Sequence, residues 1–264
     1  MNQDAAVPVV IGELSCVPHE PVGQIVELRL PSVTRRFDWS RPTYLGSAAF
    51  WVEQARRFPA PRTYQVGATL AEEVVLCLLG GYGVTETMAF AAFCHLRELD
   101  MLDVDPTPST TQLEQALLEP LRVDGRMVRY RFPRQRAQRV AQSLATLAEH
   151  DPPEGLPARA LRDWLRHLPG VGPKTASWIV RNRIRANDVA VIDIHIRRAG
   201  VFAGVFDRQW CLPRDYPAFE DAFCAWASLG NVPTADLDAC IWSQLSRLGN
   251  RARNLFGVDS LAAL

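Results

Sequence analysis

The segment from Leu168 to Ala176, which reads Leu-Pro-Gly-Val-Gly-Pro-Lys-Thr-Ala, constrains the fold more than any other part of the chain. It separates a helical pattern over residues 157–167 from another that begins at Pro173, and so predicts two helices joined by a tight turn. Two glycines spaced by one residue permit positive φ and leave backbone N–H groups uncovered. These groups and the dipole of the second helix favour an anion. The turn therefore predicts a phosphate-binding site whose contacts do not depend on the base sequence of a nucleic acid.

Lys174, which follows the proline that opens the second helix, is the only lysine of the chain. The other 28 of the 29 basic residues are arginine. Arginine makes better bidentate contacts, but it cannot lose its proton and act as an amine nucleophile. A lysine used once, at a loop-to-helix junction, therefore indicates that an amine matters there. The alternative is that an arginine-rich composition leaves one lysine by chance.

Charge is distributed unevenly, although the formal net charge is zero. Residues 122–200 carry 16 basic and 7 acidic side chains, whereas residues 1–121 carry 8 and 15. A neutral chain with a basic middle predicts a localised anion-binding face. Within that middle, residues 126–139 hold six arginines interleaved with aromatic and apolar residues, and no acid. This composition suits phosphate contact and insertion between bases.

Helical patterns account for most of the chain from about residue 44 onwards. Capping-box sequences at residues 69–72 and 111–114 predict two helix starts. Pro133 and Pro157 predict two more, and Thr234 is expected to cap the last long helix. Residues 24–30 partly alternate and are a candidate strand, but one short strand makes no sheet. The sequence therefore predicts an all-α protein with a short irregular N-terminal extension that contains at most a little β structure.

We expect three regions along the chain. Residues 1–65 are an N-terminal extension with the first helix, which packs on the C-terminal helices. Residues 66–168 are a helical subdomain, and residues 169–264 contain the hairpin, the catalytic loop and the C-terminal helices.

Cysteine spacing and hydropathy exclude several classes of protein. The six cysteines contain no CxxC pair, and their spacing suits neither a zinc site nor an iron–sulfur cluster, so we expect free thiols and no cofactor. No apolar run reaches the roughly 18 residues of a membrane span. The first residues lack the basic region of a signal peptide. We therefore expect a cytoplasmic protein, nucleoid-associated if prokaryotic, with no membrane partner.

Residues 168–178 resemble the helix-hairpin-helix of the DNA glycosylase superfamily that is named after that hairpin and its Gly-Pro-Asp loop. Residues 189–198, Val-Ala-Val-Ile-Asp-Ile-His-Ile-Arg-Arg, are similar to the family loop whose aspartate begins a new helix. The 19-residue step from Lys174 to Asp193 fits the family. A lysine at this position is typical of its bifunctional members, such as endonuclease III and 8-oxoguanine DNA glycosylase. The strongest similarity spans residues 156–200, and a weaker helical likeness extends from about 66 to 255.

The resemblance implies a DNA base-excision glycosylase with an associated AP lyase activity. It implies two helical subdomains with the active site in the cleft between them, double-stranded DNA with a damaged or modified base as partner, and a monomer. The chemistry supports the pair independently, because a neutral amine such as that of Lys174 can attack C1′ and become a Schiff base. The carboxylate of Asp193 can stabilise the oxocarbenium-like sugar and move protons. Asp193 is also expected to cap its helix, and the two roles are compatible.

A flipped base needs a stacking surface and contacts to its edge. Trp178 lies one helical turn beyond Lys174 on the same face, and an indole there can stack on the base or simply belong to the core. The amide of Gln244 suits a base edge, as in the helix that it loosely resembles in the oxoguanine enzymes, although a surface glutamine is the alternative.

The remaining candidate residues are expected to touch DNA. Arg136 and Arg131 belong to a segment that resembles the family region near the base opposite the lesion, and Tyr82 is a candidate wedge or part of a plain turn. His195 can donate to a phosphate or be a structural hydrogen bonder. The hairpin itself contributes Gly170, Val171 and Gly172 as phosphate contacts, and the carbonyls of Leu168 and Val171 as a monovalent cation site, with no catalytic metal expected.

The substrate is less constrained than the class of enzyme. Because the cysteine quartet of endonuclease III is absent, the sequence favours the oxoguanine branch, and 8-oxoguanine is the favoured base. The stretch of about 60 N-terminal residues is too short for the β-rich domain of the larger oxoguanine enzymes. Three alternatives stay open: another damaged or hypermodified base, a monofunctional glycosylase, or a non-catalytic module that uses the hairpin only to bind DNA.

Overall fold

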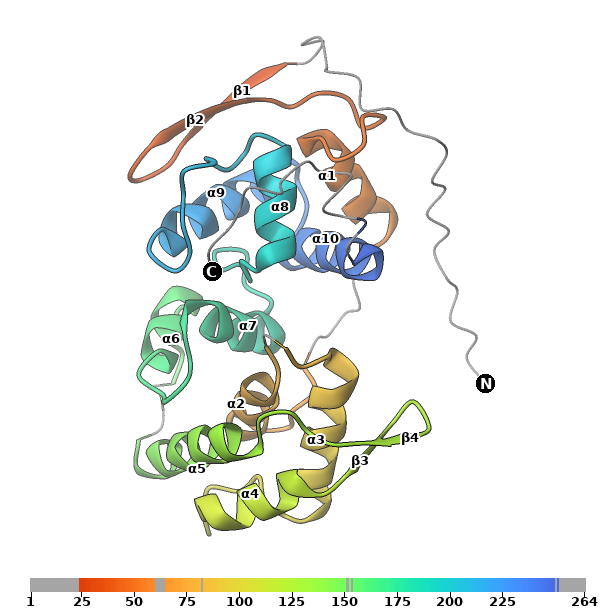
Figure 1. Ribbon diagram of the computed structural model, residues 1–264. Helices are drawn as coiled ribbons and strands as arrows, with labels where there is room; N and C mark the ends of the chain where they lie inside the picture. The colour runs from red at the N-terminus through yellow and green to blue at the C-terminus, as the bar shows by residue number, and fades with distance from the viewer. Residues whose placement is uncertain are drawn as a thin grey trace.

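The computed structural model describes residues 24–59, 65–81, 83–150, 152, 154–249 and 251. Over these residues the chain forms ten helices and four short strands, so the all-α prediction is confirmed (Figure 1). None of these helices combines the length and the apolar composition that a membrane span requires. In chain order the elements are β1 (Ile25–Arg29), β2 (Thr34–Asp38), α1 (Ala48–Arg57), α2 (Leu70–Leu79), α3 (Glu86–Glu98), α4 (Thr110–Leu118), β3 (Leu121–Val123), β4 (Arg126–Val128), α5 (Pro133–Glu149), α6 (Ala158–Leu165), α7 (Pro173–Ile184), α8 (Ile194–Phe202), α9 (Tyr216–Leu229) and α10 (Thr234–Leu248).

The helices enclose two hydrophobic cores, which lie one above the other in Figure 1. The first is built by α2 to α7 and includes the fully buried Leu113 and Leu144. The second is built by the β1–β2 hairpin, α1 and α8 to α10, and includes Trp51 and Trp226. The chain passes from the first core to the second near residue 190, immediately before the aspartate that the motif singles out.

Helix α7 takes part in both halves of the molecule. Its apolar face, with Ala176, Ile179 and Val180, lies in the first core. Its polar side chains Ser177 and Arg181 are bonded to carboxylates of α9 and α10. The predicted division of the chain, which assigns this helix to residues 169–264, stays a prediction.

Several helix starts differ from the expected ones. Thr69 does cap α2 by accepting from the Glu72 N–H, as expected. The capping box predicted at residues 111–114 is wrong, because Ser109 and Gln112 form the box two residues earlier. Thr234 is not the N-cap of α10 but its first residue. Its hydroxyl donates instead to the carbonyl of Asn187, at 2.8 Å, and ties α10 to the loop after α7.

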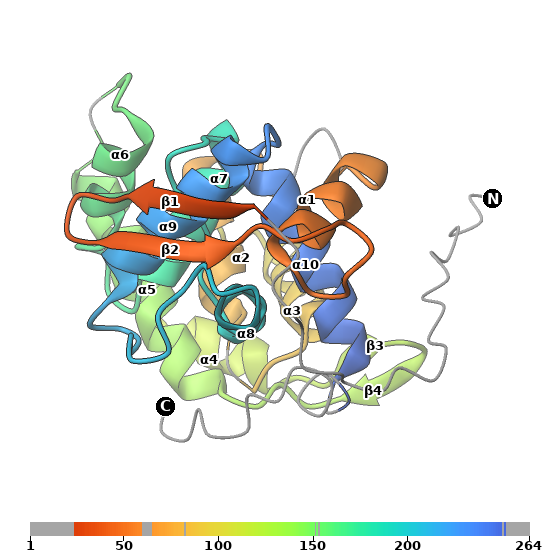
Figure 2. The same cartoon turned by 90° about the horizontal axis from the view of Figure 1, so that it is seen from above.

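The little β structure expected in the N-terminal extension is present, as a hairpin of two strands rather than a single strand. β1 pairs with β2 in an antiparallel hairpin in which Val26 lies opposite Phe37. Leu28 and Phe37 are buried in the second core, and the hairpin lies across the outer side of α8 and α9 (Figure 2). Thr34–Asp38 supplies the partner strand, which the alternation of a single strand could not reveal.

A second hairpin, β3–β4, was not expected. Leu121 lies opposite Val128 and Val123 opposite Arg126, around the two-residue turn Asp124-Gly125. Both turn residues have positive φ, 49° and 77°, which is typical of the Asp-Gly turns that join short antiparallel strands. This dipeptide was a local signal for the hairpin, hidden within a segment that stood out for its charge.

Gly200, inside α8, gives a direct test of the packing of the second core. A Cβ at this position would lie 2.3 Å from the ring of the buried Phe206. Gly200→Ala should gain about 1 kcal/mol of helix propensity but lose more through overpacking, which costs about 1–3 kcal/mol where neighbours cannot move. We expect a lower free energy of unfolding in urea. In a Gly200→Ala/Phe206→Leu double variant the loss should be smaller than the sum of the two single losses. Strict additivity would show that the two groups do not touch.

Candidate active site

The turn between α6 and α7 is braced by α5. Gly170 has a φ of +83°, and a Cβ there would lie 2.5 Å from the side chain of Arg139. The Ser143 hydroxyl donates to the carbonyl of Pro169 at 3.2 Å. Gly172 is the N-cap of α7 with an ordinary φ of −86°, so only the first glycine needs its conformational freedom. No side chain caps α7, which leaves its first N–H groups without the side-chain acceptor that most helices have.

Lys174 lies in the first turn of α7 and is half-buried. Its Nζ is 5.7 Å from the ring centroid of Trp178, so the amine and the indole share one face of the helix, as expected. Trp178 packs on the edge of the first core, and Gly80 approaches its ring so closely that a Cβ there would lie 3.2 Å away. The loop between α2 and α3 therefore covers the indole beside the amine.

Asp193 caps α8. Its Oδ1 accepts from the N–H groups of His195 and Ile196, at 2.8 and 2.9 Å. Its second oxygen, Oδ2, has no hydrogen-bond donor among the residues that the structure describes. One oxygen thus performs the capping that the sequence predicts, and the other makes no hydrogen bond with the described residues.

His195, two residues after Asp193, lies within electrostatic range of both the Lys174 amine and the Asp193 carboxylate. Burial lowers the pKa of the His195 imidazole, the negative charge of Asp193 opposes this shift, and the positive charges of Arg198 and Lys174 add to it. The Nδ1 atom of His195 is buried and has no hydrogen-bond partner within the described part of the chain. The imidazole therefore lies near both candidate catalytic groups, and its buried Nδ1 lacks a partner within the described residues.

A buried carboxylate on α9, Glu220, holds this arrangement together. Its Oε1 accepts from the Ser177 hydroxyl at 2.7 Å and from the Ala190 N–H at 3.1 Å, and its Oε2 accepts from Arg162. Burial raises the pKa of Glu220, and these three donors oppose the rise. One side chain, 1% exposed, thereby joins α6, α7 and the segment that leads to Asp193.

Two further side chains hold the same segment. The Tyr216 hydroxyl, one turn before Glu220, donates to the carbonyl of Ala190 at 2.7 Å and accepts from the Ile192 N–H at 3.2 Å. Asp238 of α10 pairs with Arg181 of α7 at 2.9 Å, and its carboxylate lies near the Val191 N–H. Burial, together with the negative charge of Asp193, raises the pKa of Asp238 to about 6, against the lowering effects of Arg181 and of the Val191 N–H. Residues 190–192 are therefore fixed by α9 and α10 just before Asp193.

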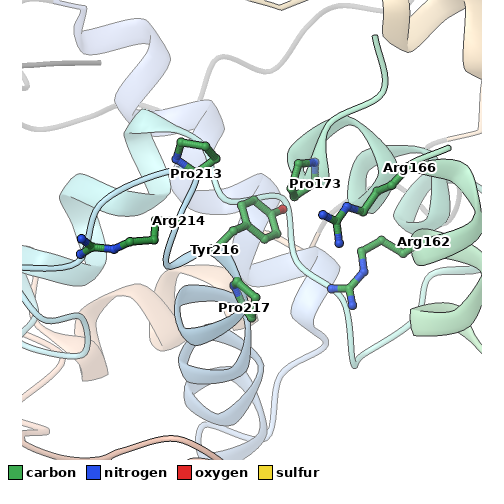
Figure 3. Close-up of a pocket in the computed structure, with 7 residues that line it drawn as sticks. All are labelled: Arg162, Arg166, Pro173, Pro213, Arg214, Tyr216 and Pro217. Carbon is green, nitrogen blue, oxygen red and sulfur yellow. The ribbon is translucent and has the colours of Figure 1, made fainter. Parts of the chain in front are cut away.

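A cavity of about 140 Å³ lies between the hairpin and the segment that precedes α9 (Figure 3). It does not include the predicted base-pocket residues Trp178 and Gln244. Its three arginines are each paired with a carboxylate, so its positive charge is largely neutralised. The cavity is lined by Arg162, Arg166, Pro173, Pro213, Arg214, Tyr216 and Pro217.

The two candidate arginines lie against the loop between α2 and α3. Arg136 is 8% exposed, and burial lowers its pKa; its Nη2 is 3.6 Å from where a Cβ of Gly81 would be. Arg131 is exposed, stacks over Phe132 with its guanidinium carbon 5.0 Å from the ring centroid, and approaches Gly83. Tyr82, the candidate wedge in this loop, lies outside the described residues. Both arginines therefore border the loop that contacts Trp178.

Gln244 lies farther from these groups in the fold. It is half-buried on α10, and its amide nitrogen contacts Gln54 Oε1 of α1 at 3.4 Å and Cys240 Sγ at 3.3 Å. At the hairpin, the carbonyl of Leu168 already accepts from the Val171 N–H at 3.1 Å. The base-edge role of Gln244 and the cation site stay predictions.

The sequence pointed to Lys174, Trp178, Asp193 and His195, which the fold brings into one neighbourhood. It gave no indication of Glu220, Tyr216 or Asp238. These residues lie on amphipathic helices whose pattern says only that one face is buried. Their roles depend on which loop packs beneath them, and no local motif encodes that.

Comparison with known proteins gives a family match and several structural likenesses. The family model of 8-oxoguanine DNA glycosylase matches residues 54–231. No curated protein sequence matches the chain. The solved structures described next are at most 23% identical to this chain, so their similarity shows the fold alone.

Two of the similar structures come from Methanocaldococcus jannaschii. The 8-oxoguanine DNA glycosylase of this organism is 23% identical over 66% of this chain and 77% of that chain, with a TM-score of 0.53. Its 8-oxoguanine glycosylase/lyase in complex with a 15mer DNA containing 8-oxoguanine is 20% identical over 76% and 89%, with a TM-score of 0.54. The 8-oxoguanine DNA glycosylase of Thermotoga maritima is 20% identical over 75% and 88%, with a TM-score of 0.52.

The energetic role of Glu220 can be measured by unfolding. Glu220→Gln leaves Arg162 buried without its main counter-charge, and breaking a buried pair from one side costs about 3 kcal/mol or more. Ser177→Ala, the matched control on the same carboxylate, should cost only about 1 kcal/mol. A Glu220→Gln/Arg162→Met variant should recover part of the loss, because no unpaired charge remains. Equal losses for Glu220→Gln and Ser177→Ala in urea would contradict this account.

Proposed function

Since the chain belongs to the 8-oxoguanine DNA glycosylase family of helix-hairpin-helix enzymes, we propose that it excises 8-oxoguanine from double-stranded DNA and cleaves the strand at the resulting abasic site. The observation that carries the proposal is the placement of Lys174 and Asp193. They come from α7 and α8, and Glu220 joins the two helices by accepting from Ser177 of α7 and from the Ala190 N–H, three residues before Asp193.

In the proposed reaction the neutral amine of Lys174 attacks C1′ of a flipped nucleotide. The N-glycosidic bond breaks, and the base leaves with the bonding electrons and takes up a proton. The Asp193 Oδ2, which is not used for capping, stabilises the positive charge on the sugar and accepts a proton from the attacking amine. The sugar ring then opens, leaving an imine between C1′ and Nζ. Loss of a proton from C2′ and breakage of the C3′–O bond cleave the strand by β-elimination.

The surroundings of Lys174 support binding of a flipped nucleotide. Trp178 presents its indole beside the amine, where a base can stack on the part of the ring that the core leaves exposed. The uncapped start of α7 offers N–H groups and a favourable dipole to a backbone phosphate. His195, whose buried Nδ1 has no partner among the described residues, can donate to a second phosphate only where DNA binding exposes that atom. The reaction as proposed uses only side chains of the chain and needs no cofactor.

The comparison structures support the choice of substrate. The Methanocaldococcus jannaschii glycosylase/lyase complex contains a 15mer DNA with 8-oxoguanine, and it aligns with 76% of this chain. Arg131 and Arg136, which border the loop over Trp178, are proposed to contact the strand near the opposite base. Gln244 is proposed to contact a base edge. To do so, its amide must give up its contacts with Gln54 and Cys240.

A panel of duplexes, each with one modified base, tests the proposal under single-turnover conditions. We expect release of 8-oxoguanine and strand cleavage by the wild type, and a loss of at least about 10³-fold for Lys174→Gln, because the nucleophile is gone. Lys174→Arg keeps the charge but not the nucleophilic amine, so it should lose as much activity and still bind DNA. Arg166→Gln, which removes an exposed charge near the hairpin, should keep its rate.

Other outcomes would replace the proposal with a stated alternative. Full excision by Lys174→Gln would exclude the amine as nucleophile. Base release without strand cleavage would identify a monofunctional enzyme, and preference for another modified base would change the substrate. Binding of the duplex without release of any base would identify a non-catalytic module.

A further inference from the structure

The arginines of residues 122–139 lack acidic partners. Ion pairs engage arginines of the β1–β2 hairpin, α1, α6 and α7, but none of the seven arginines between residues 122 and 139 takes part in an ion pair with any described residue. Asp124, at the tip of the β3–β4 hairpin, is the one acid in this range. Uncompensated like charges repel one another, and an anionic partner relieves that repulsion.

The β3–β4 hairpin presents part of this charge on a free face. Its register places Arg122 directly opposite Met127, and Arg129, the first residue after β4, is two residues beyond Met127 and falls on the same face if the alternation of β4 continues. All three side chains are exposed, Met127 by 62%. The other face is anchored, because Leu121 is buried in the first core. The hairpin is therefore held from one side and offers arginine, methionine and arginine on the other.

The hairpin continues directly into the candidate DNA site. It extends from the helical body beside α3 (Figures 1 and 2). Three residues after β4 the chain reaches Arg131, which lies against Gly83 in the loop over Trp178. Arg131 follows Gly125, at the tip, by six positions in the sequence, so the hairpin can reach at most about 20 Å from that loop. At 3.4 Å per nucleotide step, this distance corresponds to about six base pairs.

We propose that the β3–β4 hairpin is a second DNA-binding element, which places Arg122 and Arg129 on backbone phosphates and Met127 in the minor groove within about six base pairs of the flipped nucleotide. The inference rests on the proposed function, because it takes duplex DNA as the partner. Arginine pairs flanking an exposed apolar side chain suit the minor groove, where such side chains wedge beside base steps. Continuity with Arg131 favours DNA over an acidic protein as the partner.

The matched experiment compares two hairpins in the full-length protein. Arg122→Gln/Arg129→Gln removes two exposed charges in and just after the β3–β4 hairpin, and Arg29→Gln/Arg36→Gln removes two exposed charges of β1–β2, both of which are paired with Glu27. Dissociation constants are measured from about 50 to 200 mM salt, on a duplex of about 30 base pairs with a non-cleavable abasic analogue. We expect the first variant to reduce the slope of log Kd against log salt by about 2 and to weaken binding on the order of tenfold. The control should match the wild type.

Duplex length provides the second measurement. Two further duplexes are each shortened to about three base pairs on one side of the analogue. On the duplex that lacks the side that the hairpin reaches, the wild type and the β3–β4 variant should have equal dissociation constants. Met127→Ser, which leaves the charges in place, should weaken binding to the long duplex without changing the salt slope. Thermal unfolding of each variant confirms that it is folded.

Several results would overturn the inference. An unchanged slope of log Kd against log salt for the β3–β4 variant would fit an acidic protein partner instead. Equal losses of DNA affinity for both double variants would reflect net charge alone. For the β3–β4 variant, the single-turnover cleavage rate at saturating DNA should stay within about twofold of the wild-type rate. A wild type that binds but does not cleave would remove the proposed function and leave the binding comparison readable.

Discussion

The position of α7 relative to the segment before Asp193 depends on one buried carboxylate, Glu220. A carboxylate is tolerated in such a site only when donors replace the water it loses, and Glu220 has three, from α6, α7 and the Ala190 backbone. Lys174 belongs to a helix whose apolar face lies in the first core, whereas Asp193 begins a helix of the second. The carboxylate joins these two halves, so the distance between amine and aspartate is set by tertiary contacts outside the motif.

Different polar contacts hold different segments around the candidate site. Tyr216 and Asp238 fix residues 190–192, so Asp193 reaches α8 with one oxygen on the helix N-terminus and the other open. The hairpin and α5 fix the start of α7, and the loop between α2 and α3 closes over Trp178. In the proposed reaction, the chemistry therefore takes place on helix ends that packing has already oriented, with phosphate-binding groups arranged around them.

Local motifs made the family predictable, whereas the contacts that depend on long-range packing could not be predicted. The hairpin, the lysine and the helix-capping aspartate are each encoded within a few residues, and they pointed to the family whose model matches residues 54–231. Glu220 could not be found this way, because its partners lie 30 to 58 residues away in the sequence. The capping box at 111–114 failed because Ser109 and Gln112 compete with the same pattern two residues earlier. The contact of Gln244 with α1 follows from the N-terminal helix covering α10, which periodicity does not encode.

Reductive trapping followed by peptide mapping tests the central claim most directly. Borohydride converts an imine between protein and abasic DNA into a stable amine, and Lys174 is the only lysine in the chain, so the adduct can form only there or at the N-terminal amine. After digestion, mass spectrometry should find the sugar remnant on the peptide that contains Lys174. A remnant on the N-terminal peptide, or base release with no trapped adduct, would contradict the account.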